Sequence, residues 1–472
     1  MQNHTKTTNS NMTRRRFLQR TAGGATAACC VPAIVPSSVF GAFAPSGRVN
    51  VAFIGVGNQS RIDLPAFLEH DGVQVVAVCD VNRGSNHYLK PEDFLGREPG
   101  QKKVNEYYAT KTGVGQYKGC DAYEDFREVL GRADVDAVTI IVPDQWHGVI
   151  TTLAAKAGKD IYCEKPLSLT VHQGQQMVKA VRQYKRVLQT GSMYRSSPNA
   201  RFMCELVRNG HLGQVKRIIT DVARNNFKGP GPGWKPMPVP EGFNYDMWLG
   251  PAPEAPYHED RCLYRFRFIR DYSGGQTTNF GAHSNDLAQL ALGKDGSGPI
   301  EFEDLGAEFP EPGSLYNAPT KIHFRALYDS GVELMCQMTE RGFGIRIEGT
   351  EGWVDLTYNE KGGLTTSPAS LKDVKIGPNE IHLAEANKSR QEDQQKYYIV
   401  DHVRNFVDCI QSREDPVARV EIGHGTANLC HLANIAMLLH RKVRWDPKKE
   451  QVIGDDEAAA MLSRPLRAPW KI

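Results

Sequence analysis

The sequence predicts an α/β protein that begins with a doubly wound parallel sheet and continues into a second α/β domain. Short apolar runs alternate with helical stretches over residues 49–166, which is typical of parallel strands joined by helices. Residues 214–356 instead hold strand-like segments in which apolar and polar residues alternate, as expected where one face of a sheet packs on a core. The chain has 472 residues, enough for two domains.

The composition is that of an ordinary globular protein. Apolar residues make up 40% of the chain, charged residues 24%, and the formal net charge is +3, so no nucleic-acid surface is expected. After the first 44 residues, no apolar run approaches the ~20 residues that a membrane-spanning helix needs. None of the ten cysteines forms a CxxC pair, which argues against a zinc site of that kind.

The first 44 residues are interpreted as a twin-arginine signal peptide. Three arginines stand within Thr13–Gln19, and a weakly apolar stretch extends from there to about Phe43, as in signals of this export route. The route accepts folded cargo, so a cofactor can be loaded before the chain crosses. We therefore expect a periplasmic or otherwise exported protein. A disordered basic tail is the alternative.

The first structural unit is a strand, a glycine-bearing loop and a helix. The expected strand Val49–Ile54 leads into this loop, and a helix follows over residues 60–69. Gly55 permits a tight turn, Gly57 lets the backbone approach a pyrophosphate, and the helix N-terminus directs N–H groups at that anion. Ser60 stands where a third glycine is commoner. The loop residues predicted to bind a dinucleotide are Gly55, Gly57, Asn58, Gln59 and Ser60.

Asp80 bears on the choice of cofactor. It ends the second expected strand, Val73–Cys79, where a carboxylate can accept a hydrogen bond from a ribose 2′-OH. Its charge would repel a 2′-phosphate, so NAD is favoured over NADP. Arg83 is close enough in sequence to soften this argument, and NADP stays the alternative.

Further strands should bring side chains to the same edge of the sheet. Residues 82–120 are polar and are interpreted as an insertion, followed by a helix over residues 123–131. A buried strand, Val135–Val142, precedes the turn Pro143–His147, and a strand at 160–163 precedes Glu164-Lys165-Pro166. Doubly wound sheets bind ligands at the carboxyl ends of their strands.

Four motifs together resemble the Gfo/Idh/MocA oxidoreductases, a family that includes glucose–fructose oxidoreductase and inositol dehydrogenase. They are the Gly55 loop, the Pro143–His147 turn, Glu164-Lys165-Pro166 and the Gly274-Gly275…Gly281-Ala282-His283…Asp286 stretch. The resemblance covers nearly the whole chain after the leader. It implies a Rossmann domain, here residues 45–190, and an α/β domain with a large, open, mostly antiparallel sheet, here residues 191–445. It also implies a homo-oligomer, a dimer or tetramer. Residues 446–472 are left as a C-terminal tail.

The second domain shows segments that suit such a sheet. Strands are expected within 214–224, 321–338 and 345–356, and helices at 199–209, 395–410 and 422–439. The run Gly229–Gly233 is expected to be a loop.

By the resemblance, Lys165 contacts both the cofactor and the reacting oxygen, and His283 is the general base. Oxidation of an alcohol removes a proton and a hydride. A cation near the oxygen stabilises the developing charge, and imidazole can take the proton. If residues 276–287 are helical, Asn279, His283 and Asp286 share one face. Several family members carry Asp at the position of Asn279; Asn can hold the imidazole but supplies no charge. Asp286 could compensate, or be a structural acid.

Other site residues are predicted with less support. Pro143, His147 and Glu164 join the cofactor contacts, and Tyr194 and Arg195 are expected to point toward cofactor and substrate. Trp146 is expected near the nicotinamide or in the core. A metal site is not expected, because His283 and Asp286 have no clear third ligand. Weaker substrate candidates are Arg224, Asn225, Trp234 and Tyr264.

The sequence therefore predicts an exported NAD-dependent oxidoreductase acting on a sugar or polyol. No free nicotinamide pool is expected outside the cytoplasm, so the cofactor should be tightly held and recycled on the enzyme. Recycling can couple the oxidation of one sugar to the reduction of another. It can also oxidise, eliminate from and reduce one sugar, so that the net reaction is glycoside cleavage. A sugar-binding protein that kept the fold is the non-enzymatic alternative.

Overall fold

The computed structural model describes residues 47–358, 363–386 and 398–472. The predicted signal peptide and the start of the helix expected at 395–410 lie outside the described residues. Within the described ranges, no helix is long and apolar enough to cross a membrane. The eight cysteines of these ranges are buried and unpaired.

The first sheet is parallel and doubly wound, as the strand–helix alternation predicts. Its six strands stand in the order β3-β2-β1-β4-β5-β6, and each neighbouring pair is parallel. The order reverses between β1 and β4, which makes the carboxyl ends of these two strands the expected ligand site. The strands are β1 (Val49–Ile54), β2 (Val73–Cys79), β3 (Asp121–Tyr123), β4 (Ala137–Ile140), β5 (Asp160–Cys163) and β6 (Leu188–Thr190).

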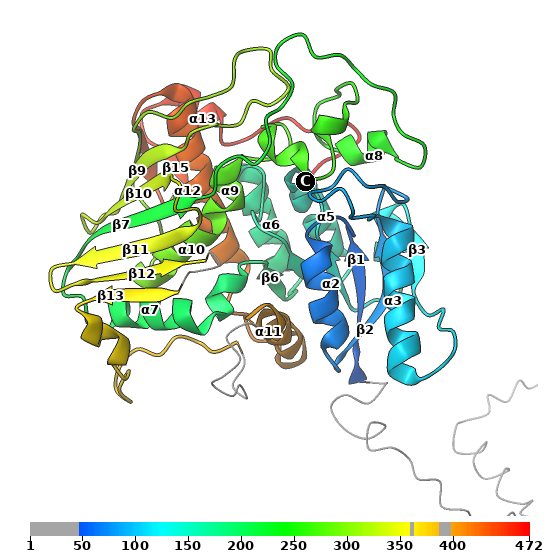
Figure 1. The fold of residues 1–472 in the computed structure, drawn as a ribbon, viewed down its shortest axis with the longest axis horizontal. Helices are drawn as coiled ribbons and strands as arrows, with labels where there is room; N and C mark the ends of the chain where they lie inside the picture. The colour runs from blue at the N-terminus through cyan, green and yellow to red at the C-terminus, as the bar shows by residue number, and fades with distance from the viewer. Residues whose placement is uncertain (1–46, 359–362, 387–397) are drawn as a thin grey trace, which may run out of the picture. The chain divides into compact units, whose positions relative to one another are not determined.

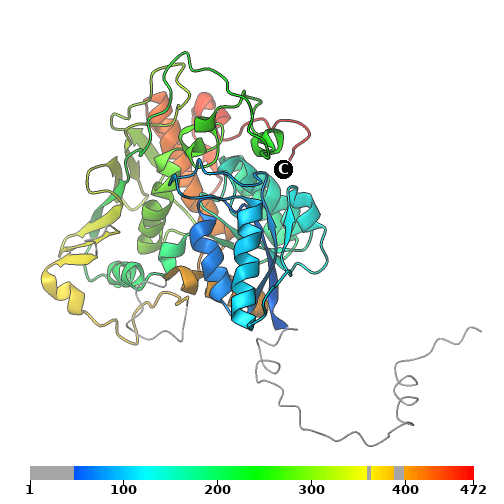
Figure 2. The same ribbon diagram turned by 45° about the vertical axis from the view of Figure 1, so that its right-hand side comes forward.

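Helices cover both faces of this sheet (Figures 1 and 2). Val51 and Phe53 of β1 pack with α2 and α3 on one face, whereas Ala52 and Ile54 pack with α5 and α6 on the other. Because both faces are buried, β1 is an almost continuous apolar run. The helices of this part are α2 (Ser60–Glu69), α3 (Arg97–Thr112), α4 (Phe126–Leu130), α5 (Asp144–Lys156) and α6 (Val171–Gln183).

Two sequence interpretations in this domain are wrong. The insertion expected at 82–120 contains the 16-residue helix α3. Its apolar face is narrow, since only Gly100, Val104 and Tyr108 are buried, so the helical period is weak in the sequence. The helix expected from Tyr123 begins at Phe126, because Tyr123 belongs to β3 and the Asp125 side chain caps the helix by accepting from the Arg127 N–H.

The second sheet has nine strands in the order β13-β12-β11-β7-β10-β9-β8-β14-β15 (Figure 1). The β7–β10 pair is parallel and the other neighbouring pairs of the described strands are antiparallel. The expected mostly antiparallel sheet is therefore confirmed. The strands are β7 (Val215–Val222), β8 (Glu301–Asp304), β9 (His323–Leu327), β10 (Glu333–Met338), β11 (Gly344–Gly349), β12 (Trp353–Thr357), β13 (Leu364–Ser367), β14 (Val443–Asp446) and β15 (Gln451–Val452).

One face of this sheet carries the core. Phe324, Leu334 and Ile347 are buried there with side chains of α7 (Pro198–Arg208), α10 (Gly281–Leu292) and α12 (Val420–Leu439). On the other face the strands carry half-buried polar residues joined by ion pairs, such as Arg217 with Glu348. The helix α11 (Tyr398–Ser412) instead packs against α2 of the first domain.

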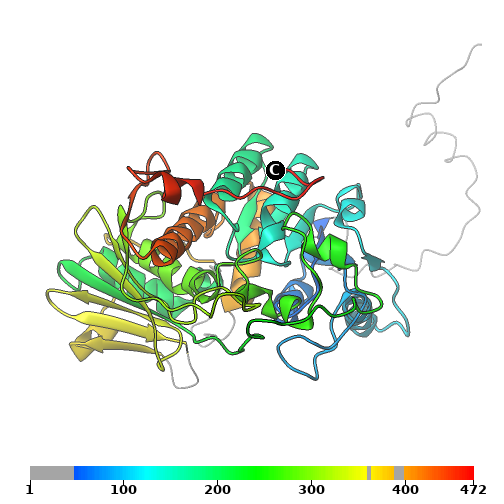
Figure 3. The same cartoon turned by 90° about the horizontal axis from the view of Figure 1, so that it is seen from above.

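Residues 446–472 contain β15 and the short helix α13 (Asp456–Ala460), and the end of the chain then returns to the parallel-sheet domain (Figure 3). The Trp470 ring meets the Trp146 ring at 4.6 Å between centroids. Arg467 pairs with Asp246 at 2.6 Å. The segment predicted as a tail therefore packs against the wall of the ligand edge.

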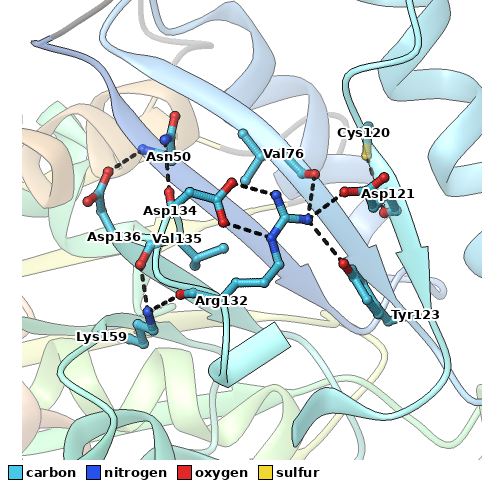
Figure 4. A network of polar contacts seen from close by, with 10 residues as sticks. All are labelled: Asn50, Val76, Cys120, Asp121, Tyr123, Arg132, Asp134, Val135, Asp136 and Lys159. Carbon is cyan, nitrogen blue, oxygen red and sulfur yellow. Dashed lines mark hydrogen bonds and ion pairs between the residues drawn. The ribbon is translucent and has the colours of Figure 1, made fainter. Parts of the chain in front are cut away.

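A polar network joins the strands at the opposite edge of the parallel sheet (Figure 4). The Arg132 guanidinium donates to both carboxylate oxygens of Asp134, to Asp121 and to the Val76 carbonyl oxygen. The Lys159 ammonium donates to the carbonyl oxygens of Arg132 and Val135. These bonds satisfy carbonyl groups in the segment that leads into β4 and link β2 and β3 to it.

Candidate functional site

A cavity lies at the carboxyl ends of the parallel strands. Together with the open solvent in its mouth, it holds about 1130 Å³. The first domain contributes one wall and residues 247–279 contribute the other. This is the edge at which doubly wound sheets bind ligands. Lining residues named in the sequence analysis are Gly55, Gly57, Asn58, Gln59, Asp80, Pro143, Trp146, Glu164, Lys165, Tyr264 and Asn279.

The glycine loop is built for close approach of a ligand. Gly55 has φ +94°, and a Cβ there would lie 2.1 Å from the Ile141 carbonyl oxygen, so a side chain is excluded. A Cβ on Gly57 would lie 2.9 Å from the Tyr88 ring. The N–H groups of Gly57, Asn58 and Gln59 have no acceptor among the described residues, and the buried Asn58 Oδ1 has no partner there either.

These unpaired groups fit a bound dinucleotide. Free N–H groups at the start of α2 suit a pyrophosphate. Ser60 does not line the cavity; its hydroxyl donates to the Gly57 carbonyl oxygen at 2.6 Å and holds the loop from behind. The Ser60 side chain therefore shapes the loop, and its predicted contact with a cofactor stays a prediction.

Asp80 lies at the end of β2, as predicted, but its carboxylate is already engaged by the backbone. One oxygen accepts from the Val56 N–H and the other from the Asn82 N–H, each at 2.9 Å. Burial raises the pKa of Asp80, and these two hydrogen bonds oppose that rise. The carboxylate retains lone pairs for a ribose hydroxyl.

The cation that contacts Asp80 is Arg97, not Arg83. Arg97 donates to the Asp80 carbonyl oxygen at 3.2 Å and pairs with Glu124 at 3.1 Å. Arg83 pairs with the exposed Glu241 and does not line the cavity. Its proximity in sequence therefore gives no reason to expect a 2′-phosphate at Asp80.

The segment before α3 closes this end of the cavity with an aromatic ring. Tyr88 lines the cavity opposite Gly57 and is held by a hydrogen bond from the Asn82 amide at 3.1 Å. Tyr88 could not be predicted from the sequence, because a single tyrosine in a polar stretch carries no periodic signal.

Lys165 and Asn279 are in direct contact at the other end. The Lys165 ammonium donates to the Asn279 side-chain oxygen at 2.9 Å and to its backbone oxygen at 3.1 Å. Its third N–H has no acceptor among the described residues. Burial lowers the pKa of Lys165, and the Glu164 charge opposes this.

The expected contact of Asn279 with the His283 ring is not formed. The Asn279 amide donates to Gln276 at 2.8 Å, so both ends of its side chain are used away from the imidazole. Residues 276–292 are helical but divided at Phe280 into α9 (Gln276–Asn279) and α10. A neutral residue at position 279 leaves the Lys165 charge without a counterion there.

Glu164 lies beneath Lys165. One of its carboxylate oxygens accepts from the Lys165 backbone N–H at 3.2 Å, and the other is buried without a partner among the described residues. Burial raises the pKa of Glu164 to about 7, against the opposing effect of Lys165. Asp63 of α2, which the sequence analysis missed, is buried close by, and burial raises its pKa too.

His283 is buried beside the cavity rather than in its wall. Its ring meets the Tyr194 ring edge-on at 4.8 Å and the Phe343 ring at 5.8 Å. Burial lowers the pKa of His283 well below its usual value, and the Lys165 charge lowers it further. The imidazole is therefore neutral at pH 7, and its buried Nδ1 has no partner among the described residues.

Two predicted site residues pair with each other instead of lining the cavity. Arg195 forms two hydrogen bonds to Asp286, at 2.7 and 2.9 Å, and also pairs with Asp295. Thr426 donates to the same Asp286 carboxylate at 2.9 Å. This buried ion pair joins α10 to the segment before α7. Asp286 therefore does not replace a missing charge beside His283, and no group of three potential metal ligands occurs in the described ranges.

Trp146 lies in the cavity wall, and His147 lies behind it. The two ring nitrogens of His147 face the carbonyl oxygens of Val142 and Pro166 at 2.9 and 2.8 Å, so His147 joins the ends of β4 and β5. Trp146 packs against Trp470 and Phe126. The predicted contact between His147 and the cofactor is therefore indirect in this arrangement.

The weaker substrate candidates fall in different places. Tyr264 lines the cavity. Arg224 and Asn225 line a separate cavity beside Gly229 and Pro230. Trp234 lies beneath the Arg261 guanidinium, which is 5.2 Å from the ring centroid.

Three further lining residues were not predicted from the sequence: Asp144 in the first-domain wall, and Arg267 and Ser273 in the opposite wall. Asp144 starts α5, and its buried Oδ2 has no partner among the described residues. Burial raises the pKa of Asp144, and the nearby His147 charge opposes this. Arg267 and Ser273 lie in a stretch without helical or strand periodicity, so the sequence pattern gave no reason to choose them.

A doubly wound domain with a glycine loop, joined to an open-sheet domain that closes its ligand edge, defines a dinucleotide-dependent two-domain enzyme class. The chain belongs to the Gfo/Idh/MocA oxidoreductase family. The model of its NAD-binding Rossmann fold matches residues 49–192, and that of its C-terminal alpha/beta domain matches residues 199–362 and 386–472. The resemblance inferred from the motifs is thus confirmed.

Characterised relatives are distant. An alpha-N-acetylgalactosaminidase from Shewanella oneidensis is 29% identical over 238 residues, which are 46% of this chain and 44% of the relative. A 1,5-anhydro-D-fructose reductase from Ensifer adhaerens is 34% identical over 107 residues, 23% of this chain and 31% of the relative. The chain's matches thus span less than half the length of these relatives.

Solved structures show the same fold at low identity. Levoglucosan dehydrogenase in complex with NADH and levoglucosan has a TM-score of 0.57 and 16% identity, covering 84% of this chain and 99% of that one. The aldose-aldose oxidoreductase of Caulobacter crescentus has a TM-score of 0.55 and 21% identity over the same shares.

Proposed function

We propose that the protein is an exported, NAD-dependent oxidoreductase that transfers hydride between a tightly held nicotinamide cofactor and a hydroxyl group of a sugar or polyol. The observation that carries the proposal is Lys165. Its ammonium stands in the wall of the cavity that begins at the glycine loop, and one of its N–H groups is free to bind an oxygen.

The residues divide the chemistry between them. When bound, the nicotinamide ring exchanges a hydride with the carbinol carbon. Lys165 donates a hydrogen bond to the substrate oxygen and stabilises negative charge as the carbonyl forms. Neutral His283 accepts the hydroxyl proton, so that the substrate loses one proton and one hydride.

NAD is proposed over NADP because the Asp80 carboxylate faces the cavity and would repel a 2′-phosphate. The relative solved with NADH points the same way. Export is proposed from the arginine motif at Thr13–Gln19, and tight retention follows from export, because the cofactor must be reduced and reoxidised without a free pool.

Glycoside cleavage through transient oxidation is a second candidate. It is favoured by one observation: several of the matched relatives are described as glycosyl hydrolase family 109 proteins or as an alpha-N-acetylgalactosaminidase. The same Lys165 and His283 would serve the oxidation, and the cofactor would end in its starting state.

Native mass spectrometry and a sugar panel test these proposals. The full chain should retain nucleotide after purification, and sugars or polyols should change the absorbance of the nicotinamide in wild type but not in Lys165→Ala. Glycosides that release an aglycone without net reduction would select the cleavage reaction. A protein that binds sugars with no nicotinamide change in either form would instead be a binding protein.

A further inference from the structure

Arg267 places a second positive charge in the catalytic cavity. It belongs to a short 3₁₀ helix, η5 (Arg265–Phe268), and lines the same wall as Asn279. Its guanidinium stacks on the Tyr264 ring at 3.7 Å from the centroid and donates to the Tyr264 carbonyl oxygen. The stacking fixes the plane of the guanidinium, so its orientation is set before any ligand arrives.

No carboxylate of the described ranges forms an ion pair with Arg267. Its contacts are the Tyr264 carbonyl and two aromatic rings. The neighbouring Arg265 pairs with Asp260, and the buried Arg195 pairs with two acids. Arg267, which stays charged at neutral pH, therefore has no carboxylate partner among the described residues. The buried Arg261 also has none, but the Pro256 carbonyl oxygen and the Tyr272 hydroxyl hold it away from the cavity lining.

Asp144, the acid whose charge interacts with Arg267, does not neutralise the guanidinium. Asp144 interacts with the Arg267 charge, but burial raises the pKa of its carboxyl and no ion pair joins the two side chains in the described ranges. Lys165 adds a second positive charge, and its ammonium contacts only the two oxygens of Asn279. Three acids interact with it through space, Glu164, Asp144 and Asp63, but burial raises the pKa of each and so weakens their negative charge. The wall around Lys165 and Arg267 therefore suits an anion.

The position of Arg267 points to the substrate rather than to the cofactor. The pyrophosphate is expected at Gly55–Gln59 and the adenosine ribose at Asp80. Arg267 instead lines the wall that carries Asn279, the hydrogen-bond partner of Lys165, at the end where the substrate oxygen is expected. A planar guanidinium with free N–H groups binds oxyanions in a bidentate manner.

We propose that the substrate is an acidic sugar, bearing a carboxylate or a phosphate ester, and that Arg267 binds this oxyanion while Lys165 binds the reacting oxygen. The inference rests on the proposed function, because it assumes hydride transfer at Lys165. It names the substrate class of the same site.

Matched sugar sets test the proposal with the full-length holoprotein. Each set joins a neutral aldose to its uronic acid and its 6-phosphate, for glucose, galactose and mannose. The nicotinamide absorbance gives kcat and KM for each, and calorimetry gives the affinity of each sugar whether or not it reacts. We expect one acidic member to exceed its neutral partner by at least about tenfold in kcat/KM. The uronate and phosphate arms show which oxyanion it is.

Variants assign the preference to Arg267. Arg267→Gln should remove most of the difference between acid and neutral sugar, mainly through KM, and leave NAD affinity unchanged. Arg265→Gln is the matched control, since Arg265 lies in the same 3₁₀ helix but does not line the cavity. Arg265→Gln should change neither the preference for the acidic sugar nor the NAD affinity.

Three results would overturn the inference. Neutral sugars could react as well as acidic ones; Arg267→Gln could weaken NAD and sugar binding equally, which would place Arg267 on the cofactor; or acidic sugars could show no calorimetric advantage. A different failure, in which no sugar of any kind changes the nicotinamide absorbance, would refute the proposed hydride transfer, while the calorimetric comparison would still decide whether Arg267 selects acidic ligands.

Discussion

At the scale of single residues, the site depends on which buried charges are neutralised and which are not. Asn279 accepts two hydrogen bonds from the Lys165 ammonium but adds no negative charge, so the ammonium stays available to a substrate oxygen. His283 stays neutral because burial and the Lys165 charge disfavour its protonation. The charges of Arg195 and Asp286 neutralise each other in a buried ion pair. We therefore propose that the chemistry depends on Lys165 and His283.

Replacement of His283 separates catalysis from cofactor binding. His283→Ala removes the proposed proton acceptor, and general-base catalysis typically contributes about 10²–10⁴-fold. We expect hydride transfer to fall by that order while the protein keeps its nucleotide, as measured by stopped-flow absorbance and native mass spectrometry. Loss of nucleotide together with activity would show a structural role for the ring.

Asp80→Ala addresses the choice of cofactor. Removal of the carboxylate deletes an acceptor for the ribose hydroxyl and the repulsion of a 2′-phosphate, so NAD affinity should fall by about tenfold or more and NADP affinity much less. Titration of nucleotide-free protein with both cofactors checks this. Equal losses for the two would mean that Asp80 acts only on the backbone of Val56 and Asn82.

Glu164 should make stability depend on pH. Its folded-state pKa of about 7 lies above the usual carboxyl value, so the unfolded chain loses this proton at lower pH than the folded protein. The contribution of Glu164 is therefore complete below about pH 4.5 and is lost as the pH rises through about 7, by roughly 3 kcal/mol at most.

Urea unfolding of the nucleotide-free protein between about pH 5 and about pH 8 measures this loss. Glu164→Gln should flatten the pH dependence, and Glu106→Gln, at an exposed site, should not. If the Glu164→Gln profile keeps the wild-type slope, another group holds the proton.

At the scale of elements, a polar network stabilises the parallel sheet at one end of its strands. The proposed ligand site lies at the other end. The Arg132 network at the non-ligand edge joins β2, β3 and the approach to β4. Arg132→Met keeps the aliphatic stem but removes the donor to the Val76 carbonyl oxygen and to the Asp121 and Asp134 carboxylates, which costs about 1–3 kcal/mol. The midpoint of thermal unfolding should fall while NAD affinity persists. Lys102→Met, at an exposed ion pair, is the control; an equal effect there would deny the network a special role.

The elements also show how far the sequence can predict. β1, the glycine loop and β2 were predictable because each depends on neighbouring residues: apolar runs, a φ that only glycine tolerates, and an acid at a strand end. The helix α3 was not predicted, because its narrow apolar face gives only a weak helical period in the sequence. The Arg195–Asp286 pair joins residues 91 positions apart, so no local pattern reveals it. Asp144 and Arg267 became site residues only when the wall of residues 247–279 closed on the sheet.

At the scale of the whole molecule, chain segments remote in sequence support the cavity from behind. Trp470, near the C-terminus, packs on the lining residue Trp146, and α11 packs on α2. We expect this support to contribute to the tight nucleotide retention that we propose. The homo-oligomer, a dimer or tetramer, stays a prediction that light scattering of the purified protein can test.

Isotope transfer tests the central claim, hydride exchange at Lys165, most directly. The holoprotein would be incubated with a reactive sugar deuterated at its carbinol carbons, and the cofactor released and weighed by mass spectrometry. We predict that the reduced nicotinamide gains the deuterium in wild type and that Lys165→Ala yields no labelled cofactor. Product formed in wild type with an unlabelled nicotinamide would contradict the account.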